Sequence, residues 1–345
     1  MGKPAVPAQM EALVLASYGP PPFPLGVETR PVPKPGNGQV LIRVTASPVN
    51  PSDLHFLEGE YAFRKRLPTV PGLEGSGRVV DVGDGLLARR LAGKRVAFAP
   101  ATQADGSWAQ YAVASATQCF RLPDRISDEV GAMALVNPLA AIGLMERLKA
   151  LRATSFVSTA AASALGQMLL RLGRKRGLDV INVVRRPEQV DLLTRHGATH
   201  VLNTADRDFQ DQLDELCRRL HCRVALDAIG GDMTAQLLGA LLPGGRAIVY
   251  GGLARQPMVL PQPDIVFGNK SVEGFYVPTW LATKSLPKLV LLERRIPRLL
   301  DRELGTDVRE RVTLEDAPRA IEDYRHAMTG GKVLITPDQS RGTTR

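Results

Sequence analysis

The chain has 345 residues, of which 44% are hydrophobic and 23% are charged, a composition typical of a globular protein long enough for two domains. Its net charge of +9 does not indicate nucleic acid, because the basic residues are spread along the sequence and only 5% of the residues are aromatic. An anionic cofactor and substrate account for the positive charge equally well.

Three further observations restrict the class of protein. The cysteines, Cys119, Cys217 and Cys222, form no metal-binding or disulfide pattern. No apolar run reaches the roughly 20 residues of a membrane span. The N-terminal sequence has neither the apolar core of a secretory signal nor the amphipathic character of a transit peptide. We therefore expect a cytoplasmic protein without a disulfide framework or a membrane partner.

The N-terminal part is rich in proline, with more than half of the 26 prolines before Asp124. Short β-prone segments separated by Pro and Gly turns predict a compact, largely antiparallel β domain. These segments are residues 12–16, 40–47, 77–82, 95–99 and 109–114. From Asp124 the pattern becomes helical, and residues 127–151 predict one or two helices with a break at Pro138.

Residues 154–186 predict a strand, a tight turn, a helix and a second strand. Apolar residues recur at i, i+3, i+4 and i+7 on one helical face, namely Leu165, Met168, Leu169 and Leu172. This order is typical of the first βαβ unit of a dinucleotide-binding sheet, whose turn holds the pyrophosphate at the helix N-terminus. The predicted cofactor contacts in this turn are Ala161, Ser163, Ala164, Leu165 and Gly166.

The turn departs from the usual three-glycine fingerprint, which weakens the signal. Its small side chains still let the backbone approach a phosphate, and a buried crossover without a ligand is the alternative. Arg185 and Arg186 end the second strand, where an NAD site usually has an acidic residue and an NADP site an arginine. They favour NADPH. The alternative is that the two arginines only cap a solvated strand end and bind no phosphate.

The strand and helix alternation continues and predicts a parallel, doubly wound sheet. Its further strands are expected at residues 224–227, 247–250 and 271–275, and a final strand at 332–335 is expected to return to the β domain. We therefore predict a catalytic domain from residues 1–123 and 277–345, and a cofactor domain from residues 124–276.

Several segments resemble the medium-chain dehydrogenase/reductase superfamily. They are residues 49–61, 71–83, 135–141, 159–167, 181–186, 227–231, 250–257 and 274–280. The chain is most similar to the zinc-free 2-enoyl thioester reductases, and next to the quinone oxidoreductases. The resemblance implies a GroES-like β domain, a Rossmann NADPH-binding domain and a homodimer. It also implies cofactor contacts at Tyr250, Gly251, Gly252, Phe275 and Val277.

The resemblance also bears on the metal. Zinc-dependent relatives bind their metal through a Cys and a His at two positions that here hold Asn50 and Leu73, and no Cys or His lies between Asp124 and Ala153. We expect no metal. Alcohol oxidation needs a Lewis acid to stabilise the alkoxide, so reduction of a polarised C=C bond fits the residues better.

Tyr61 lies at the position of the catalytic tyrosine of similar enoyl reductases, where a protonated phenol donates to the developing enolate. The alternative is a tyrosine that only packs in a loop. Asn50 is a candidate for holding the nicotinamide or the substrate carbonyl, or else it ties its loop together. The basic run Arg64, Lys65 and Arg66 either meets the phosphates of coenzyme A or a carrier protein, or is simply solvated.

The favoured function is NADPH-dependent reduction of a trans-2-enoyl thioester, and an NADPH:quinone or enone reductase is the alternative. A third possibility is a cofactor-loaded protein that contacts RNA or another protein without turnover, but it lacks the concentrated basic groove such a role needs. We expect a homodimer joined through the strand at residues 271–277, because an unpaired strand edge invites a symmetric partner.

Overall fold

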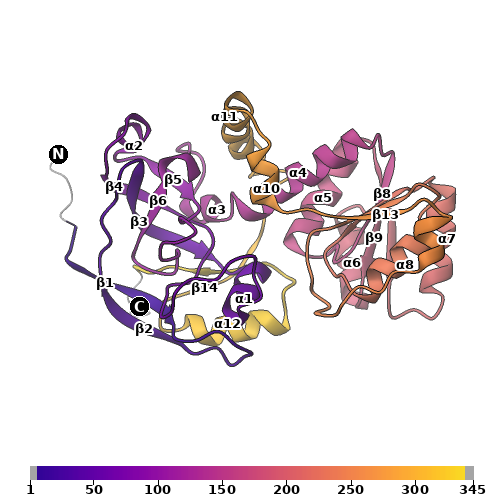
Figure 1. Ribbon diagram of the computed structural model, residues 1–345, viewed down its shortest axis with the longest axis horizontal. Helices are drawn as coiled ribbons and strands as arrows, with labels where there is room; N and C mark the ends of the chain where they lie inside the picture. The colour runs from indigo at the N-terminus through magenta and orange to yellow at the C-terminus, as the bar shows by residue number, and fades with distance from the viewer. Residues whose placement is uncertain (1–5, 339–345) are drawn as a thin grey trace. The chain divides into compact units, whose positions relative to one another are not determined.

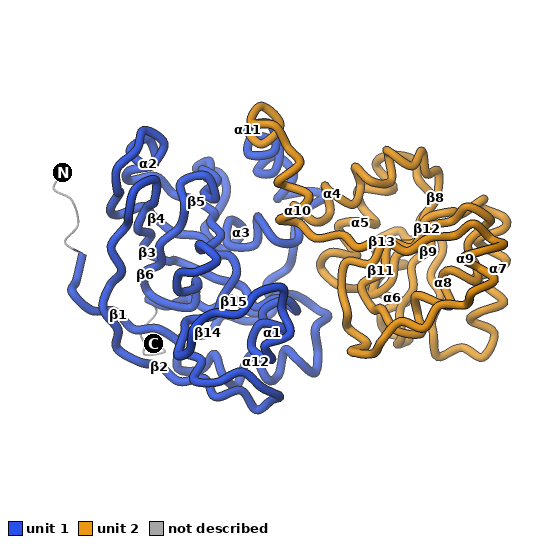
Figure 2. The backbone as a smooth tube through the Cα atoms, viewed as in Figure 1, with its two compact units in different colours: residues 1–137, 290–345 blue, residues 138–289 orange. Residues whose placement is uncertain are grey.

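The computed structural model describes residues 6–338. The chain folds into two compact units (Figure 2). Unit 1 comprises Met1–Asn137 and Val290–Arg345, and unit 2 comprises Pro138–Leu289.

Unit 1 is built mainly from strands (Figure 1). Strands β1 (Gln9–Leu15) and β2 (Leu25–Pro31) form an antiparallel pair. A sheet of seven strands has the order β14-β15-β3-β4-β5-β7, with β6 paired to β3. Its strands are β3 (Gln39–Pro48), β4 (Gly75–Val82), β5 (Arg95–Phe98), β6 (Tyr111–Ser115), β7 (Cys119–Arg121), β14 (Val308–Val312) and β15 (Lys332–Ile335). Only the β14–β15 pairing is parallel, which confirms the predicted, largely antiparallel β domain.

Strand β15 brings the C-terminal part of the chain beside the end of β3. Leu334 pairs antiparallel with Pro48, and the Val49 N–H donates to Val333 O at 3.0 Å. Because antiparallel partners run in opposite directions, the residue before Val333 lies opposite the start of helix α1 (Pro51–Glu58). The predicted return of strand 332–335 to the β domain is confirmed.

The remaining helices of unit 1 are short. They are α2 (Leu86–Leu91), α3 (Asp128–Ala132), α12 (Ala317–His326) and the 3-10 turns η1 (Ala116–Gln118) and η2 (Ile296–Arg298). Leu54 and Phe56 of α1 and Tyr324 of α12 are buried in one apolar core with Trp108. The two helices are therefore held by tertiary packing, which fixes the segments that precede and follow them.

Unit 2 is a parallel sheet with the strand order β10-β9-β8-β11-β12-β13. The strands are β8 (Ser155–Ser158), β9 (Asp179–Val184), β10 (His200–Asn203), β11 (Val224–Asp227), β12 (Arg246–Val249) and β13 (Ser271–Gly274). Strand order reverses between β8 and β11, and ligands of such sheets bind beyond the carboxyl ends of the strands at this point. The predicted doubly wound sheet is confirmed.

The helices of unit 2 follow the predicted alternation. They are α4 (Val136–Ala150) from Pro138 onward, α5 (Ala164–Lys175), α6 (Pro187–Arg195), α7 (Phe209–Arg219), α8 (Asp232–Ala240), α9 (Gln262–Val266), α10 (Val277–Ala282) and the first part of α11 (Leu286–Arg295). Pro138 does not break a helix, because it lies in the first turn of α4, where its missing N–H has no helical acceptor to lose. The break lies instead between α3 and α4.

The boundaries of the units differ from the predicted residues 123/124 and 276/277. On the N-terminal side, Asp128 of α3 belongs to unit 1, because its carboxylate pairs with Arg95 Nε at 2.9 Å and its carbonyl accepts from Ser76 Oγ at 2.6 Å. On the C-terminal side, Trp280 of α10 belongs to unit 2, since its indole N–H donates to Glu146 at 3.2 Å.

Among the described helices, none combines the length and the apolar character of a membrane span.

Candidate active site

In unit 2, the turn between β8 and α5 has the geometry of a phosphate cradle. Ala160 adopts a positive φ of 46°, and Ser163 caps α5 by accepting from the Gly166 N–H at 3.1 Å. A Cβ on Gly166 would lie 2.4 Å from Ala161 O, so only glycine fits there. The first N–H groups of α5, including those of Ala164 and Leu165, have no acceptor within the helix. They form the positive end of the helix dipole. The predicted turn residues are thus brought together.

The adjacent turn after β11 is shaped by the buried carboxylate of Asp227. This carboxylate accepts from Thr159 Oγ1 at 2.8 Å, Thr234 Oγ1 at 2.7 Å and the Ile229 N–H at 2.8 Å. It therefore joins the carboxyl ends of β8 and β11 at the point where strand order reverses. A Cβ on Gly251 would lie 2.6 Å from Ala228 O, so the predicted glycine after β12 is required by a close backbone approach.

The predicted cofactor residues after β12 and β13 have different surroundings. The Tyr250 hydroxyl is buried and has no hydrogen-bond partner among the described residues. Burial and the Asp227 carboxylate raise the pKa of Tyr250, so the phenol stays protonated as a donor. Phe275 packs beside Trp280, with ring centroids 6.3 Å apart, and Val277 begins α10. Gly252 is exposed in the loop that follows Tyr250.

The two arginines at the end of β9 also differ. Arg185 is exposed, and its backbone N–H donates to Gln189 Oε1 at 3.1 Å. Arg186 is the N-cap residue of α6, and its Nε lies 3.0 Å from Glu188 Oε1. Arg185 is therefore an exposed arginine at this edge, whereas Arg186 has an acidic neighbour.

In unit 1, Asn50 and Asp53 form the N-terminal cap of α1. The Asn50 N–H donates to Asp53 Oδ2 at 2.8 Å, and the Leu73 N–H donates to Asp53 Oδ1 at 3.1 Å. Burial, opposed by these N–H donors, raises the pKa of Asp53 to about 7. Asn50 is buried as well, at 1% exposed.

Glu74 connects this cap to the start of α4. Its Oε1 accepts from Asn50 Nδ2 at 3.0 Å, and its Oε2 accepts from the N–H groups of Leu135 at 3.0 Å and Val136 at 2.9 Å. A carboxylate at a helix N-terminus is favoured by the helix dipole. Burial nevertheless raises the pKa of Glu74 above its usual value.

Lys332 completes a buried polar cluster with Asn50, Asp53 and Glu74. Its Nζ lies 2.5 Å from Asn50 Oδ1, 3.3 Å from Val49 O and 3.3 Å from Tyr324 Oη. The local sequence does not mark Lys332 as a site residue, because it lies 282 residues from Asn50. No local motif brings the two together; only the pairing of β15 with β3 does.

Tyr61 lies between Asp53 and Glu74 along the chain and is half-buried. Its ring packs edge-on against Phe63, with centroids 5.2 Å apart. In the basic run that follows, Arg64 and Arg66 are exposed, whereas Lys65 is buried with its Nζ 2.5 Å from Ala104 O. Burial lowers the pKa of Lys65 to about 8. The three basic residues therefore do not form one exposed cluster.

One group of possible metal ligands occurs in the described part of the chain. His55, Glu58 and Glu60 have ligand atoms within 4.8 Å of one another. His55 Nδ1 lies 3.7 Å from Glu58 Oε2, an ordinary spacing for an ion pair on a helix, and Glu60 is exposed. These contacts alone assign no metal.

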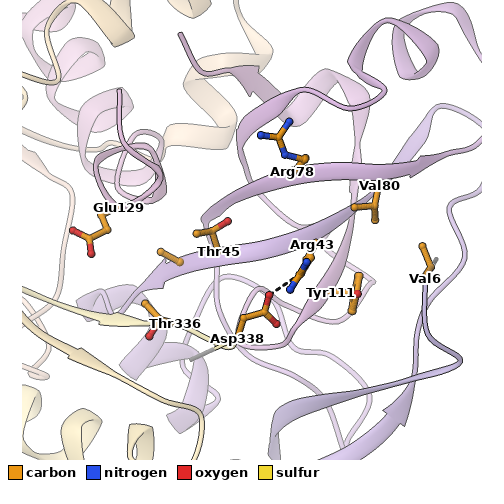
Figure 3. A pocket seen from close by; sticks show the side chains of 10 residues that line it. Val6, Arg43, Thr45, Arg78, Val80, Tyr111, Glu129, Thr336 and Asp338 are labelled. Atoms are coloured by element: carbon orange, nitrogen blue, oxygen red, sulfur yellow. Dashed lines mark hydrogen bonds and ion pairs between the residues drawn. The ribbon is translucent and has the colours of Figure 1, made fainter. Parts of the chain in front are cut away.

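A cavity of about 360 Å³ opens on the sheet of unit 1 (Figure 3). Three of its charged residues have charged partners: Arg43 Nε lies 2.7 Å from Asp338 Oδ2, and Arg311 Nη2 donates to Glu129 at 2.7 Å. Arg78 donates to the carbonyl of Gly93 at 2.9 Å. It is lined by Val6, Arg43, Thr45, Ala46, Arg78, Val80, Tyr111, Glu129, Thr336 and Asp338. None of the predicted site residues is among them.

Two protein families match separate parts of the chain. Residues 36–124 match the alcohol dehydrogenase GroES-like domain, and residues 164–292 match the zinc-binding dehydrogenase domain. These matches agree with the predicted GroES-like and Rossmann domains.

Curated relatives and solved structures cover nearly the whole chain. Mitochondrial enoyl-[acyl-carrier-protein] reductases from Mus musculus and Xenopus tropicalis are 31% and 30% identical, over 96% and 94% of this chain and 89% and 94% of theirs. The structure of a proposed NADPH:quinone reductase from Mesorhizobium loti is 34% identical, with a TM-score of 0.89 over 96% of this chain and 100% of that one. A mycobacterial protein complexed with NADPH is 26% identical, with a TM-score of 0.81 over 95% and 100%. The chain therefore belongs to the medium-chain dehydrogenase/reductase superfamily, alongside the enoyl-[acyl-carrier-protein] reductases and the NADPH:quinone reductases.

Proposed function

We propose that the protein is an NADPH-dependent reductase of a polarised C=C bond, and that its substrate is a trans-2-enoyl thioester. The observation that carries the proposal is the similarity to enoyl-[acyl-carrier-protein] reductases at 30% and 31% identity over nearly the whole chain. The favoured substrate is an enoyl group carried on coenzyme A or on a carrier protein.

The residues of unit 2 fit NADPH. The cradle at the start of α5 provides N–H donors for the pyrophosphate, and Arg185 provides an exposed guanidinium for the 2′-phosphate. The buried Tyr250 hydroxyl is a hydrogen-bond donor that has no acceptor among the described residues. When bound, the cofactor supplies the hydride that reduces the β-carbon of the enoyl group.

In unit 1, we assign Tyr61 the role of proton donor. Once hydride reaches the β-carbon, negative charge develops on the thioester oxygen, and a protonated phenol stabilises it and delivers the proton to the α-carbon. Asn50 remains the candidate for contacting a carbonyl group. One N–H of its carboxamide donates to Glu74, so the second N–H is the group for this contact.

The test compares NADPH oxidation with a short enoyl-CoA, a long enoyl-CoA and a quinone. We expect turnover of at least one enoyl-CoA and little with the quinone. The similarity to an NADPH:quinone reductase at 34% identity favours the alternative, in which the quinone is reduced and neither thioester is. Absence of NADPH oxidation with every substrate would contradict both functions.

We also propose that catalysis needs no zinc, so activity should survive exhaustive chelation. The physical reason is that Asn50 and Leu73 offer no Cys or His ligand where zinc-dependent relatives bind the metal. Elemental analysis of the purified protein, with activity measured before and after chelation, checks this. One equivalent of tightly bound zinc that is lost together with activity would contradict the prediction.

A homodimer through the free edge of β13 remains a proposal. The strand is shorter than predicted and not apolar, since Glu273 is held by Arg147 and Arg246. The apolar surface comes instead from the preceding segment, where Val259 is 74% exposed and Phe267 is 85% exposed. Exposed apolar side chains shortly before an unpaired edge strand in the sequence favour a symmetric partner.

If Val259 and Phe267 form part of the dimer interface, Phe267→Asp should convert a dimer to a monomer at micromolar concentration in light scattering. Leu286→Asp is the matched control, because Leu286 is 74% exposed on α11. A wild-type monomer, or a Phe267→Asp dimer, would contradict this interface.

The cytoplasmic location also stays a prediction, because the relatives named above are mitochondrial proteins.

A further inference from the structure

The surroundings of Lys332 determine the orientation of a neighbouring amide. The residue is 3% exposed, and its Nζ faces Asn50 Oδ1, Val49 O and Tyr324 Oη. An ammonium has three N–H donors and no acceptor, so each donor has one oxygen partner here. The atom of the Asn50 carboxamide that faces Lys332 must therefore be the oxygen.

This orientation sets the direction of the hydrogen bonds that follow. With Oδ1 turned to Lys332, the amide nitrogen of Asn50 faces Glu74 and donates to its Oε1 at 3.0 Å. The other oxygen of Glu74 accepts from two backbone N–H groups. Because all three groups facing Glu74 are donors, we describe it as a carboxylate, although burial raises its pKa. The polarity thus runs from the ammonium through the amide to the carboxylate.

The same residues do not fit the metal that the zinc-binding dehydrogenase family implies. A zinc ligand directs a lone pair at the metal, whereas Asn50 Oδ1 is directed at the Lys332 ammonium, and Leu73 has no donor atom. A divalent cation placed beside a buried ammonium would also be repelled. Lys332 supplies the positive charge that balances the buried Glu74.

We propose that Lys332 is a positioning residue that fixes the orientation of the Asn50 carboxamide and balances the charge of Glu74 in this polar cluster. Its effect on catalysis rests on the proposed function, in which the second N–H of Asn50 contacts a carbonyl group. A reversed amide would direct that N–H elsewhere. The effect on the cluster itself does not depend on any substrate.

The test is a double-mutant cycle of Lys332→Met and Glu74→Gln, measured by thermal unfolding and by kcat and KM. Lys332→Met leaves the buried Glu74 without the cation that balances it, and Glu74→Gln leaves Lys332 with Asp53 as its remaining acidic neighbour. Each single change should lower Tm by about 5 to 10 °C. In the double variant, the introduced glutamine accepts from the backbone N–H groups through its oxygen and presents its NH₂ to Asn50. The amide of Asn50 can then reverse, so Tm should recover above that of either single variant.

The kinetics separate positioning from charge balance. We expect kcat on an enoyl thioester to fall in Lys332→Met, where Asn50 Oδ1 loses its donor and only Glu74 still holds the amide. We expect it to fall by about tenfold or more in the double variant, where the amide reverses and its second N–H is misdirected. Recovery of kcat together with Tm would overturn the positioning role and leave charge balance alone. Additive losses of Tm would overturn the coupling of the two residues.

Lys270→Met is the matched control in unit 2. Lys270 is also a buried lysine, whose Nζ donates to Leu238 O at 2.5 Å and pairs with Asp264 at 2.8 Å. Its replacement should lower Tm but leave kcat within about twofold, since it positions no residue of the proposed site. A loss of kcat in Lys270→Met equal to that in Lys332→Met would show that instability alone lowers turnover, and would overturn the proposal. If wild type reduces no enoyl thioester, the proposed function fails, while the Tm cycle still tests the cluster.

Discussion

Replacing Tyr61 by phenylalanine should lower kcat on an enoyl thioester by about 10²-fold or more, the usual scale for a positioned acid. The hydroxyl is the group that delivers a proton or stabilises the enolate, and the change removes only this oxygen. Affinity for NADPH should stay nearly unchanged, because Tyr61 is not among the predicted cofactor contacts, which belong to unit 2. Steady-state kinetics and a cofactor titration measure the two effects.

Tyr18→Phe is the matched control for this variant. Tyr18 belongs to the same aromatic group, and within residues 6–338 its hydroxyl bonds to the backbone of Lys65, at 3.0 Å as donor and 2.7 Å as acceptor. Its loss should change kcat less than about threefold, although stability falls by about 1 kcal/mol for the lost hydrogen bonds. Equal kcat for wild type and Tyr61→Phe would remove Tyr61 from the mechanism. It would also favour a quinone substrate, which can take its protons from water.

The second large effect is expected on cofactor choice. Wild type should prefer NADPH to NADH by at least about tenfold in kcat/KM, and the double variant Arg185→Ala, Arg186→Ala should lose most of this preference. Charge-assisted contacts to a phosphate are worth about 1.5 to 3 kcal/mol each, so two of them account for about 10²-fold or more. Because Glu188 already neighbours Arg186, we expect Arg185 to contribute the larger share.

The control removes the same charge elsewhere in unit 2. Arg218→Ala, Arg219→Ala takes two exposed arginines from the end of α7, and should leave the NADPH to NADH ratio unchanged. An equal fall in both double variants would mean that net charge, not a phosphate contact, sets the preference. Equal efficiency of wild type with both cofactors would contradict the NADPH assignment itself.

The sequence alone predicted the features that depend on neighbours along the chain. The periodicity from Leu165 to Leu172 predicted α5, and the small residues before it predicted the turn, because a helix face and a tight turn are encoded within a few residues. The resemblance placed Tyr61 and the GroES-like and Rossmann domains. The sequence is a weaker guide to where a helix begins. Proline predicts a helix break, but Pro138 lies in the first turn of α4, where proline is tolerated.

Only the tertiary structure decided the polar cluster of unit 1. Nothing in the local sequence marks Asp53, Glu74 and Lys332 as partners of Asn50. Pairing of β15 with β3 closes a separation of 282 residues and places an ammonium against Asn50. In the low dielectric of this buried site, the Lys332 ammonium orients the Asn50 amide and balances the charge of the Glu74 carboxylate. Such pairing between residues far apart in the chain leaves no periodic pattern in the sequence.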